Sequence, residues 1–308
     1  MAAEVRAAII KTGTELEDGA LASMPKDLKY VAAQIKSIIE SYKNSDISTI
    51  INNLSNIKNI EDIIVYITIL SYLAGNNSVR SDTLFDVFPR EYEKLDGLSA
   101  SRLRRLLINT LGNIDSINIY INNIIKTIEF LKNKKGLYLW ILREKRLDRF
   151  EKDVREFIFG NSGGYSVDRG IKLFLRVFID KNSIPLAYKI AYNKKEVRKY
   201  RVHGDFYTTL TTMRSGSFED VDSPTASKVR QRVARALLCR GRKERCDPLQ
   251  IRLKSVRGLV RAVAYLSGDP IAYERGAYYI GKNYCAKLRC EECPIRSVCK
   301  KYIFIEVK

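Results

Sequence analysis

Cys285-Ala-Lys-Leu-Arg-Cys290-Glu-Glu-Cys293-Pro-Ile-Arg-Ser-Val-Cys299 is a run of fifteen residues that holds four of the chain's six cysteines. Its spacing is C-x4-C-x2-C-x5-C. Four thiolates this close repel one another and are hard to keep ionised unless a cation holds them. Such a cluster is typical of a metal site and not of the spread cysteine pairs of a secreted disulfide scaffold. The run therefore predicts a metal centre with these four cysteines as ligands.

The spacing also bears on which metal is bound, since zinc and iron-sulfur clusters both accept four thiolates. A zinc site usually shows two short cysteine pairs with a longer spacer between them, whereas here four single ligands wind through one compact loop. A 4Fe-4S cluster is therefore the favoured cofactor, with zinc or unmetallated thiols as the alternatives. The other two cysteines, Cys239 and Cys246, are expected to be free thiols, with a disulfide or a second metal site as the alternative.

The chain is strongly basic, with 54 Lys and Arg against 35 Asp and Glu and a net charge of +19. Between Lys228 and Arg261 there are twelve basic residues and only two acidic ones. A patch of this kind attracts a polyanion, so nucleic acid is the expected partner and a merely solvated basic surface is the alternative. Within this patch Arg232 and Arg235 share one face of a predicted helix and are candidates for binding phosphate oxygens.

Other features of the composition fit an ordinary globular protein. The 308 residues and the 45% hydrophobic content suffice for a buried core. No run approaches eighteen apolar residues, and no secretory signal pattern opens the sequence, so neither a membrane span nor export is expected. We expect a cytoplasmic, nucleoid-associated protein.

Apolar residues recur mostly at intervals of three and four, and no segment shows a sustained alternation of period two. This pattern predicts an all-α protein. Two helix starts carry a capping side chain followed by proline, at Ser223-Pro224 and at Asp269-Pro270. The apolar segment 60–73 predicts a buried helix that stops at Gly75. Segments 103–111, 117–131 and 137–159 predict further helices, the last of them long and charged.

The segment from Tyr279 to Cys299 resembles the C-terminal iron-sulfur loop of the endonuclease III class of helix-hairpin-helix DNA glycosylases. The usual spacing in that family is C-x6-C-x2-C-x5-C, so this chain keeps the last two intervals and shortens the first. The resemblance implies two helical lobes with a helix-hairpin-helix motif and double-stranded DNA as the partner. It also implies that three basic residues of the loop contact the DNA backbone, namely Lys287, Arg289 and Arg296.

The resemblance implies a hairpin upstream of the cysteines, with glycine amides that approach a DNA phosphate. The run from Gly160 to Gly170 fits this role because it follows a basic helix and precedes the apolar segment 171–179. The expected DNA contacts in this run are Gly163, Gly164, Ser166 and Arg169. We accordingly divide the chain into an N-terminal helical region of unknown role (1–97), a glycosylase-like helical region (98–284), and the cluster loop with its tail (285–308). The first boundary falls in the loop-like segment 76–97.

In this family a catalytic Asp opens a helix after the hairpin, in a pattern like V-D-T-H-x-x-R-x-x-x-R-x-G. The best match is the run from Gly204 to Gly216, which makes Asp205 the candidate catalytic residue. Its carboxylate can activate water or stabilise the positive sugar that develops as a glycosidic bond breaks. The alternative is a helix cap with no chemistry. Members that also cleave the strand carry a Schiff-base Lys where this chain has Asp168, so Lys-dependent lyase activity is not expected.

Three hypotheses on function follow. The first is a DNA N-glycosylase of base excision repair type that lacks Lys-dependent lyase activity. The second is a non-catalytic DNA-binding or damage-sensing subunit that keeps the glycosylase scaffold. The third is a zinc-bound RNA-binding protein. A monomer is expected, with a repair or replication protein as a further partner.

Overall fold

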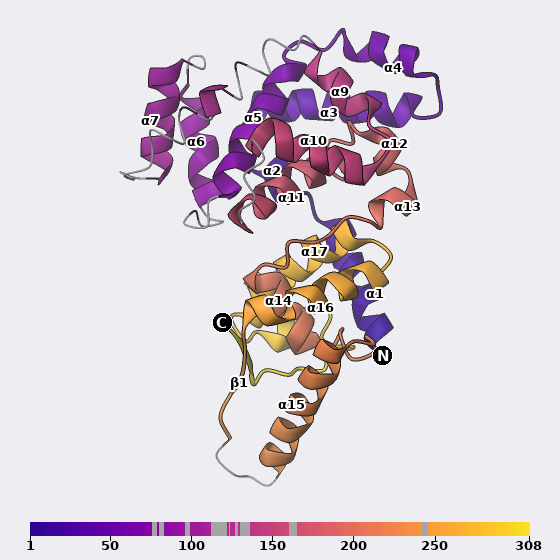
Figure 1. The fold of residues 1–308 in the computed structure, drawn as a ribbon, viewed down its shortest axis with the longest axis vertical. Helices are drawn as coiled ribbons and strands as arrows, with labels where there is room; N and C mark the ends of the chain where they lie inside the picture. The colour runs from indigo at the N-terminus through magenta and orange to yellow at the C-terminus, as the bar shows by residue number, and fades with distance from the viewer. Residues whose placement is uncertain are drawn as a thin grey trace. The chain divides into compact units, whose positions relative to one another are not determined.

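The computed structural model describes residues 1–75, 79, 83–95, 99–111, 122, 124–126, 129, 136–159, 165–241 and 246–308. The described residues are mostly helical, which confirms the all-α prediction (Figure 1). Among them no helix is long and apolar enough to cross a lipid bilayer. Most of the helix predicted over 117–131 lies outside the described residues. The chain forms two compact units, one of residues 17–197 and the other of residues 1–16 and 198–308.

The unit of residues 17–197 is built of helices alone in its described part. In chain order they are α2 (Gly19–Ala22), α3 (Lys26–Tyr42), α4 (Ile47–Leu54), α5 (Ile60–Ala74), η1 (Thr83–Val87), α6 (Phe88–Glu93), α7 (Ala100–Leu111), α9 (Leu137–Arg143), α10 (Leu147–Phe159), α11 (Tyr165–Ile179), α12 (Tyr188–Ala191) and α13 (Lys194–Val197). The core of this unit is α5, whose residues 63–71 are all buried and which packs against α11, α3 and α9. The predicted stop is confirmed, since the N–H of Gly75 donates to the carbonyl oxygen of Ser71 at 2.9 Å.

Two sequence-based expectations in this unit were wrong. The single helix predicted over 137–159 is two helices, because the backbone adopts an extended conformation at Glu144. The N–H of Leu147, in the first turn of α10, donates to the carboxylate of Glu196 at 2.9 Å, which a continuous helix would not allow. The loop-like segment 76–97 contains η1 and α6 in its described part, with Pro89 in the first turn of α6.

The other unit combines α1 (Ala2–Glu15) with the C-terminal part of the chain. Its further elements are α14 (Phe206–Ser215), α15 (Pro224–Gly241), β1 (Leu249–Ile251), α16 (Leu253–Leu266), α17 (Pro270–Ile280), η2 (Gly281–Cys285), η3 (Cys290–Glu292) and β2 (Ile305–Val307). Both predicted helix starts are confirmed: the Ser223 hydroxyl accepts the N–H of Ala226 at 3.1 Å, and Asp269 accepts that of Ala272 at 3.0 Å. The strands, which were not predicted, pair in parallel with Leu249 opposite Ile305.

The first helix belongs to the C-terminal unit because it packs directly on α17. At this crossing, Gly13 and Gly276 let the two backbones touch, since a Cβ on Gly276 would lie 2.1 Å from the carbonyl oxygen of Ile9. Arg6 adds a bidentate contact to Asp220, at 2.6 and 2.8 Å. The sequence-based division placed boundaries after residues 97 and 284, and so kept the first 97 residues together. The two units divide the chain differently, because residues 1–16 belong with residues 198–308.

Candidate metal centre and nucleic-acid interface

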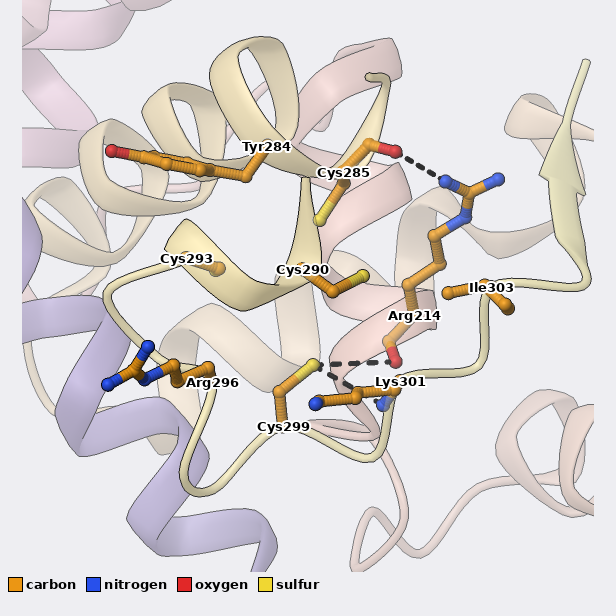
Figure 2. Close-up of a pocket in the computed structure, with 9 residues that line it drawn as sticks. All are labelled: Arg214, Tyr284, Cys285, Cys290, Cys293, Arg296, Cys299, Lys301 and Ile303. Atoms are coloured by element: carbon orange, nitrogen blue, oxygen red, sulfur yellow. Dashed lines mark hydrogen bonds between the residues drawn. The ribbon is translucent and has the colours of Figure 1, made fainter. Parts of the chain in front are cut away.

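The four cysteines of the C-terminal loop line a single pocket, although they are spread over fifteen residues (Figure 2). Cys285 ends η2, Cys290 begins η3, and the other two lie in the irregular chain that leads to β2. The space between these side chains amounts to about 350 Å³ when the open solvent at its mouth is included. Its remaining lining residues are Arg214, Tyr284, Arg296, Lys301 and Ile303. The sequence motif therefore predicted four residues that the fold does bring together.

Two side chains on one face of α14 contact this loop. Thr211 and Arg214 are three residues apart and so point the same way. The hydroxyl of Thr211 lies 3.9 Å from the sulfur of Cys285, and the guanidinium of Arg214 donates to the carbonyl oxygens of Cys285 and, at 2.9 Å, of Ile305. Arg214 thereby ties the start of the cysteine loop to the strand that follows it.

Hydrogen bonds also reach a second sulfur. The backbone N–H of Lys301 donates to the sulfur of Cys299 at 3.4 Å. Bonds from N–H and O–H groups to thiolate sulfur stabilise its negative charge and help to tune a metal centre. The sequence analysis included Arg214 only as part of the run from Gly204 to Gly216. It did not identify Tyr284, Lys301 or Ile303 as residues that line the pocket. Proximity to the cysteines in sequence was the available signal for the last three.

The loop needs a bound positive charge if its thiols are to ionise. Burial raises the pKa of the Cys285 thiol to about 12. Burial also raises the pKa of Cys293 and Cys299, and the negative charge of neighbouring cysteines adds to the effect. At neutral pH these side chains are therefore thiols until a cation binds and displaces their protons.

A zinc ion and a 4Fe-4S cluster would use four cysteines differently. Among the described residues, no three Cys, His, Asp or Glu side chains converge closely enough to hold one metal ion. A zinc site would require all four sulfurs at about 2.3 Å from a common point. In a 4Fe-4S cluster each cysteine binds a different iron, so the sulfurs stand apart around a larger body. The pocket offers four sulfur donors to either group.

The basic residues of the loop are exposed, and two of them interact with neighbouring acidic residues. Arg289 forms an ion pair with Glu292, and Arg296 donates to the backbone oxygen of Glu291 at 2.7 Å. Lys287 is exposed at the turn before Arg289. All three residues predicted to contact DNA therefore lie at the surface beside the cysteine pocket. The ion pair between Arg289 and Glu292 compensates part of the positive charge of this surface.

Helix α15 carries the Arg-rich run and is packed only through its first half. Its buried residues are Ala226, Val229 and Val233. Arg232 and Arg235 are both exposed, but Arg232 also donates to the backbone oxygen of Gln250 at 2.7 Å. Of the two predicted phosphate ligands, Arg232 is thus partly committed to the protein, and Arg235 projects into solvent.

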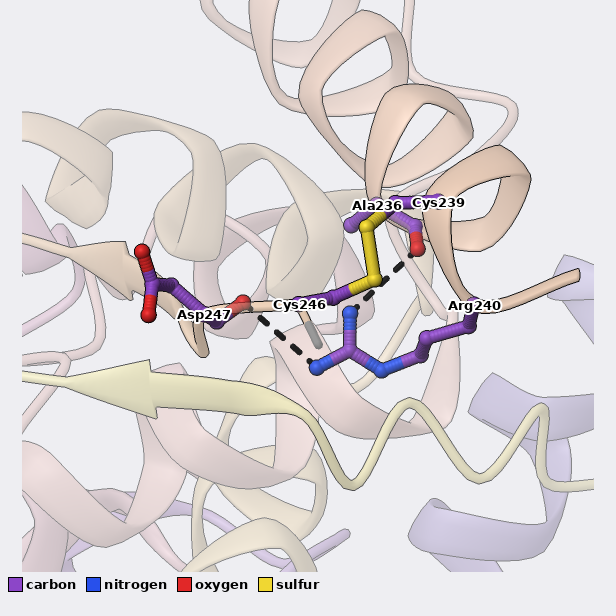
Figure 3. The surroundings of a disulfide bond; sticks show 5 residues. All are labelled: Ala236, Cys239, Arg240, Cys246 and Asp247. Atoms are coloured by element: carbon purple, nitrogen blue, oxygen red, sulfur yellow. Dashed lines mark hydrogen bonds between the residues drawn. A yellow bond between two sulfur atoms is a disulfide. The ribbon is translucent and has the colours of Figure 1, made fainter. Parts of the chain in front are cut away.

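The end of α15 is fixed by a disulfide between Cys239 and Cys246 (Figure 3). The expectation of two free thiols was wrong, because the two Cα atoms lie 6.1 Å apart, within disulfide range. Arg240 reinforces the closure: its guanidinium donates to the backbone oxygen of Ala236 at 3.3 Å and of Asp247 at 3.5 Å.

Asp205 occupies the N-cap of α14. Its carboxylate accepts the backbone N–H of Thr208 at 2.7 Å, which is the usual bond of a capping Asp. The adjacent Phe206 is 42% exposed and its ring meets that of Tyr207 edge-on, with centroids 5.3 Å apart. His203 is held through its backbone N–H, which donates to Glu274 at 2.7 Å. Asp205 thus fills the alternative role of a cap, and its carboxylate remains at the surface beside an exposed aromatic ring.

The predicted hairpin is described only in part. Gly163 and Gly164 lie outside the described residues, and Ser166 falls in the first turn of α11. The guanidinium of Arg169 donates to the backbone oxygen of Val79 at 3.0 Å, which holds this predicted DNA ligand against its own unit. Asp168, in the position of the family's Schiff-base Lys, lies 3.9 Å from Arg155.

The nearest lysine to that position is not suited to Schiff-base chemistry. Lys172 is 2% exposed, and its ammonium lies 2.7 Å from the carboxylate of Glu151. A buried, ion-paired ammonium is not accessible to a sugar.

Comparison with models of known families, with curated proteins and with solved structures found no match for this chain. The resemblance of the cysteine loop to that of helix-hairpin-helix glycosylases therefore stays a prediction.

Proposed function

We propose that this protein is a DNA-binding iron-sulfur protein of base excision repair type, and that it acts as a DNA N-glycosylase without Lys-dependent lyase activity. One observation carries the proposal: four cysteines line one pocket that opens among exposed basic side chains. A pocket of sulfur ligands alone would suit many metal proteins. Its position beside Lys287 and Arg296, in a chain of net charge +19, makes a polyanion the best partner.

In this proposal Cys285, Cys290, Cys293 and Cys299 hold a 4Fe-4S cluster. Once bound, the cluster supplies four iron-thiolate bonds that cross-link the loop. The chain's own residues orient the ligands and bind the DNA backbone. Arg214 orients Cys285 through a hydrogen bond to its carbonyl oxygen. The basic residues of the loop bind phosphate oxygens. Phosphate then competes with the carboxylate of Glu292 for Arg289, so binding is expected to weaken steeply as salt rises.

The chemistry falls to Asp205. One of its oxygens accepts the N–H of Thr208, which orients the carboxylate at the surface beside Phe206. In a complex with an extruded nucleotide, this carboxylate stabilises the positive charge of the sugar as the glycosidic bond breaks, or takes a proton from the attacking water. Phe206 offers a ring on which an unstacked base can lie.

The test is release of free base from duplexes that contain uracil, an oxidised purine or an alkylated purine. Asp205→Asn is the informative variant because asparagine caps a helix as well as aspartate does, so the fold is retained while the negative charge is lost. Base release is expected to fall by at least about 100-fold in this variant. Asp205→Ala serves as the comparison that loses both the cap and the charge.

A second candidate function is a non-catalytic DNA-binding subunit that keeps the scaffold. The bonding of Asp205 as a plain N-cap and the buried ion pair of Lys172 favour it. Wild-type protein that binds duplex DNA but releases no base from the whole panel would establish this alternative. Tighter binding of RNA than of duplex DNA would exclude both.

A further inference from the structure

The last two turns of α15 do not contribute to the core of their unit. None of residues 234–241 is buried, whereas the first half of the helix packs through Ala226, Val229 and Val233. Figure 1 shows α15 running away from the other helices of its unit. These turns therefore lie outside the core, and core packing does not explain their sequence.

Two large apolar side chains sit in this exposed segment. Leu237 is 45% exposed and Leu238 is 66% exposed. Leu238 lies one turn after Arg235 and Ala234, which are also exposed, and so shares their face. At 100° per residue this face is opposite Val229 and Val233, so Leu238 points away from the body of the unit. A solvent-facing leucine next to an exposed arginine forms a contact surface, which we name the α15 tip (residues 234–238).

The charge of α15 indicates what the tip binds. The helix carries five basic side chains and no acidic one. Basic side chains attract phosphates, and an apolar wedge beside them is the combination by which proteins enter the minor groove and open a base step. A membrane surface fits less well, because a helix that lies on lipid presents a wide apolar face, whereas α15 exposes two large apolar side chains, Leu237 and Leu238.

The tip is also held rigidly from its other side. The Cys239–Cys246 disulfide follows Leu238 directly (Figure 3). The guanidinium of Arg240 lies over the ring of Phe304 at 4.4 Å. Arg232 adds a hydrogen bond to β1. A preformed wedge loses little conformational entropy when it binds. The anchors therefore stiffen the end of the helix and leave Leu238 free to make contact.

We propose that the α15 tip inserts Leu238 into the minor groove of duplex DNA and thereby favours a distorted duplex over an intact one. The inference rests on the proposed DNA-binding function and adds to it a residue that selects the state of the duplex. Opening a base step costs least where pairing is already weakened, so the apolar contact is made most readily at a mismatch or bulge. Arg235 contributes to both duplexes alike because it binds phosphate.

The experiment compares Leu238→Ala with Arg235→Gln in the full chain. Fluorescence anisotropy measures the affinity of each for two duplexes of equal length, one fully paired and one with a central mismatch, over a series of salt concentrations. Leu238→Ala is expected to lower the preference for the mismatched duplex by about tenfold and to leave the salt slope unchanged. Arg235→Gln is expected to weaken binding of both duplexes and to reduce the slope by about 1.

The outcomes separate this inference from the proposed function. Since Leu238 is not buried, both variants should unfold at the temperature of the wild type, which excludes misfolding as the cause. An unchanged mismatch preference in Leu238→Ala overturns the inference while DNA binding stands. Wild-type protein that binds neither duplex overturns the proposed function as well. Leu238→Ala could instead abolish self-association in sedimentation, or binding to anionic vesicles, while the mismatch preference stays intact. In that case the α15 tip binds a different partner and the inference is wrong.

Discussion

Gly276→Ala tests how the first helix joins the C-terminal unit. The new Cβ would lie 2.1 Å from the carbonyl oxygen of Ile9, and ordinary contact begins at 3.4 Å, so α1 must move away by more than 1 Å. The opposing atoms are backbone and no side chain can rotate to make room. Overpacking of this severity costs about 3 kcal/mol, which the better helix propensity of alanine offsets by about 1 kcal/mol. We expect the variant to be less stable by about 2 kcal/mol.

Urea unfolding followed by far-UV circular dichroism measures this change. With an m-value of about 2 kcal/mol/M, the midpoint should fall by about 1 M. The matched control is Gly258→Ala in α16, where an added Cβ meets nothing within 4 Å. That substitution should stabilise the protein by about 0.5–1 kcal/mol, because it removes a helix-interior glycine without a clash. If Gly276→Ala proves as stable as the control, α1 does not cross α17 with the two backbones in contact at Gly276.

Three further predictions concern ionisation, redox state and the support of the loop. A hydrogen bond from Arg6 holds the pKa of Asp220 below its ordinary value of 3.8. The ion pair therefore stabilises the folded state above pH 3.8, and this stabilisation is lost as the pH falls through the lower pKa of the folded state. Asp220→Asn should therefore flatten the loss of stability below pH 3.8 in acid titrations followed by circular dichroism; an unchanged profile would show that the pair contributes nothing. Alkylation of unreduced, denatured protein should leave Cys239 and Cys246 unmodified by mass spectrometry, and labelling of both would contradict the disulfide. Arg214→Ala, which removes the bonds to two backbone carbonyls around the pocket, should speed the loss of visible absorbance in air, whereas Arg235→Gln should not.

Features set by local sequence were the ones that could be predicted. A capping side chain followed by proline fixes a helix start through atoms within one turn, which is why Ser223-Pro224 and Asp269-Pro270 mark the observed starts. The same holds for the stop at Gly75. The four cysteines were also predictable as a group, because their close spacing is typical of a metal site.

Features that depend on distant partners could not be predicted. Gly13 and Gly276 are ordinary helix residues until two segments more than 250 residues apart in sequence are brought together. The helix break before Leu147 depends on Glu196, and the strand β1 depends on β2. Strands of three residues are too short to show a periodic pattern.

The candidate catalytic residue illustrates a different limit. An Asp that opens a helix satisfies the backbone whether or not it also acts on a substrate, so the sequence around Asp205 is the same in both cases. Only the loss of activity in Asp205→Asn separates the two roles. The loop supports were missed for a geometric reason, because Arg214 reaches Cys285 from another helix.

Iron and acid-labile sulfide content of protein purified without oxygen tests the central claim most directly. We expect about four iron atoms and about four sulfides per chain, with visible absorbance that is lost in Cys290→Ser. The same variant should unfold more readily, because binding of the cluster and folding of the loop are linked. Colourless protein that contains no iron, or that contains one zinc per chain, would contradict the claim that these four cysteines hold an iron-sulfur cluster.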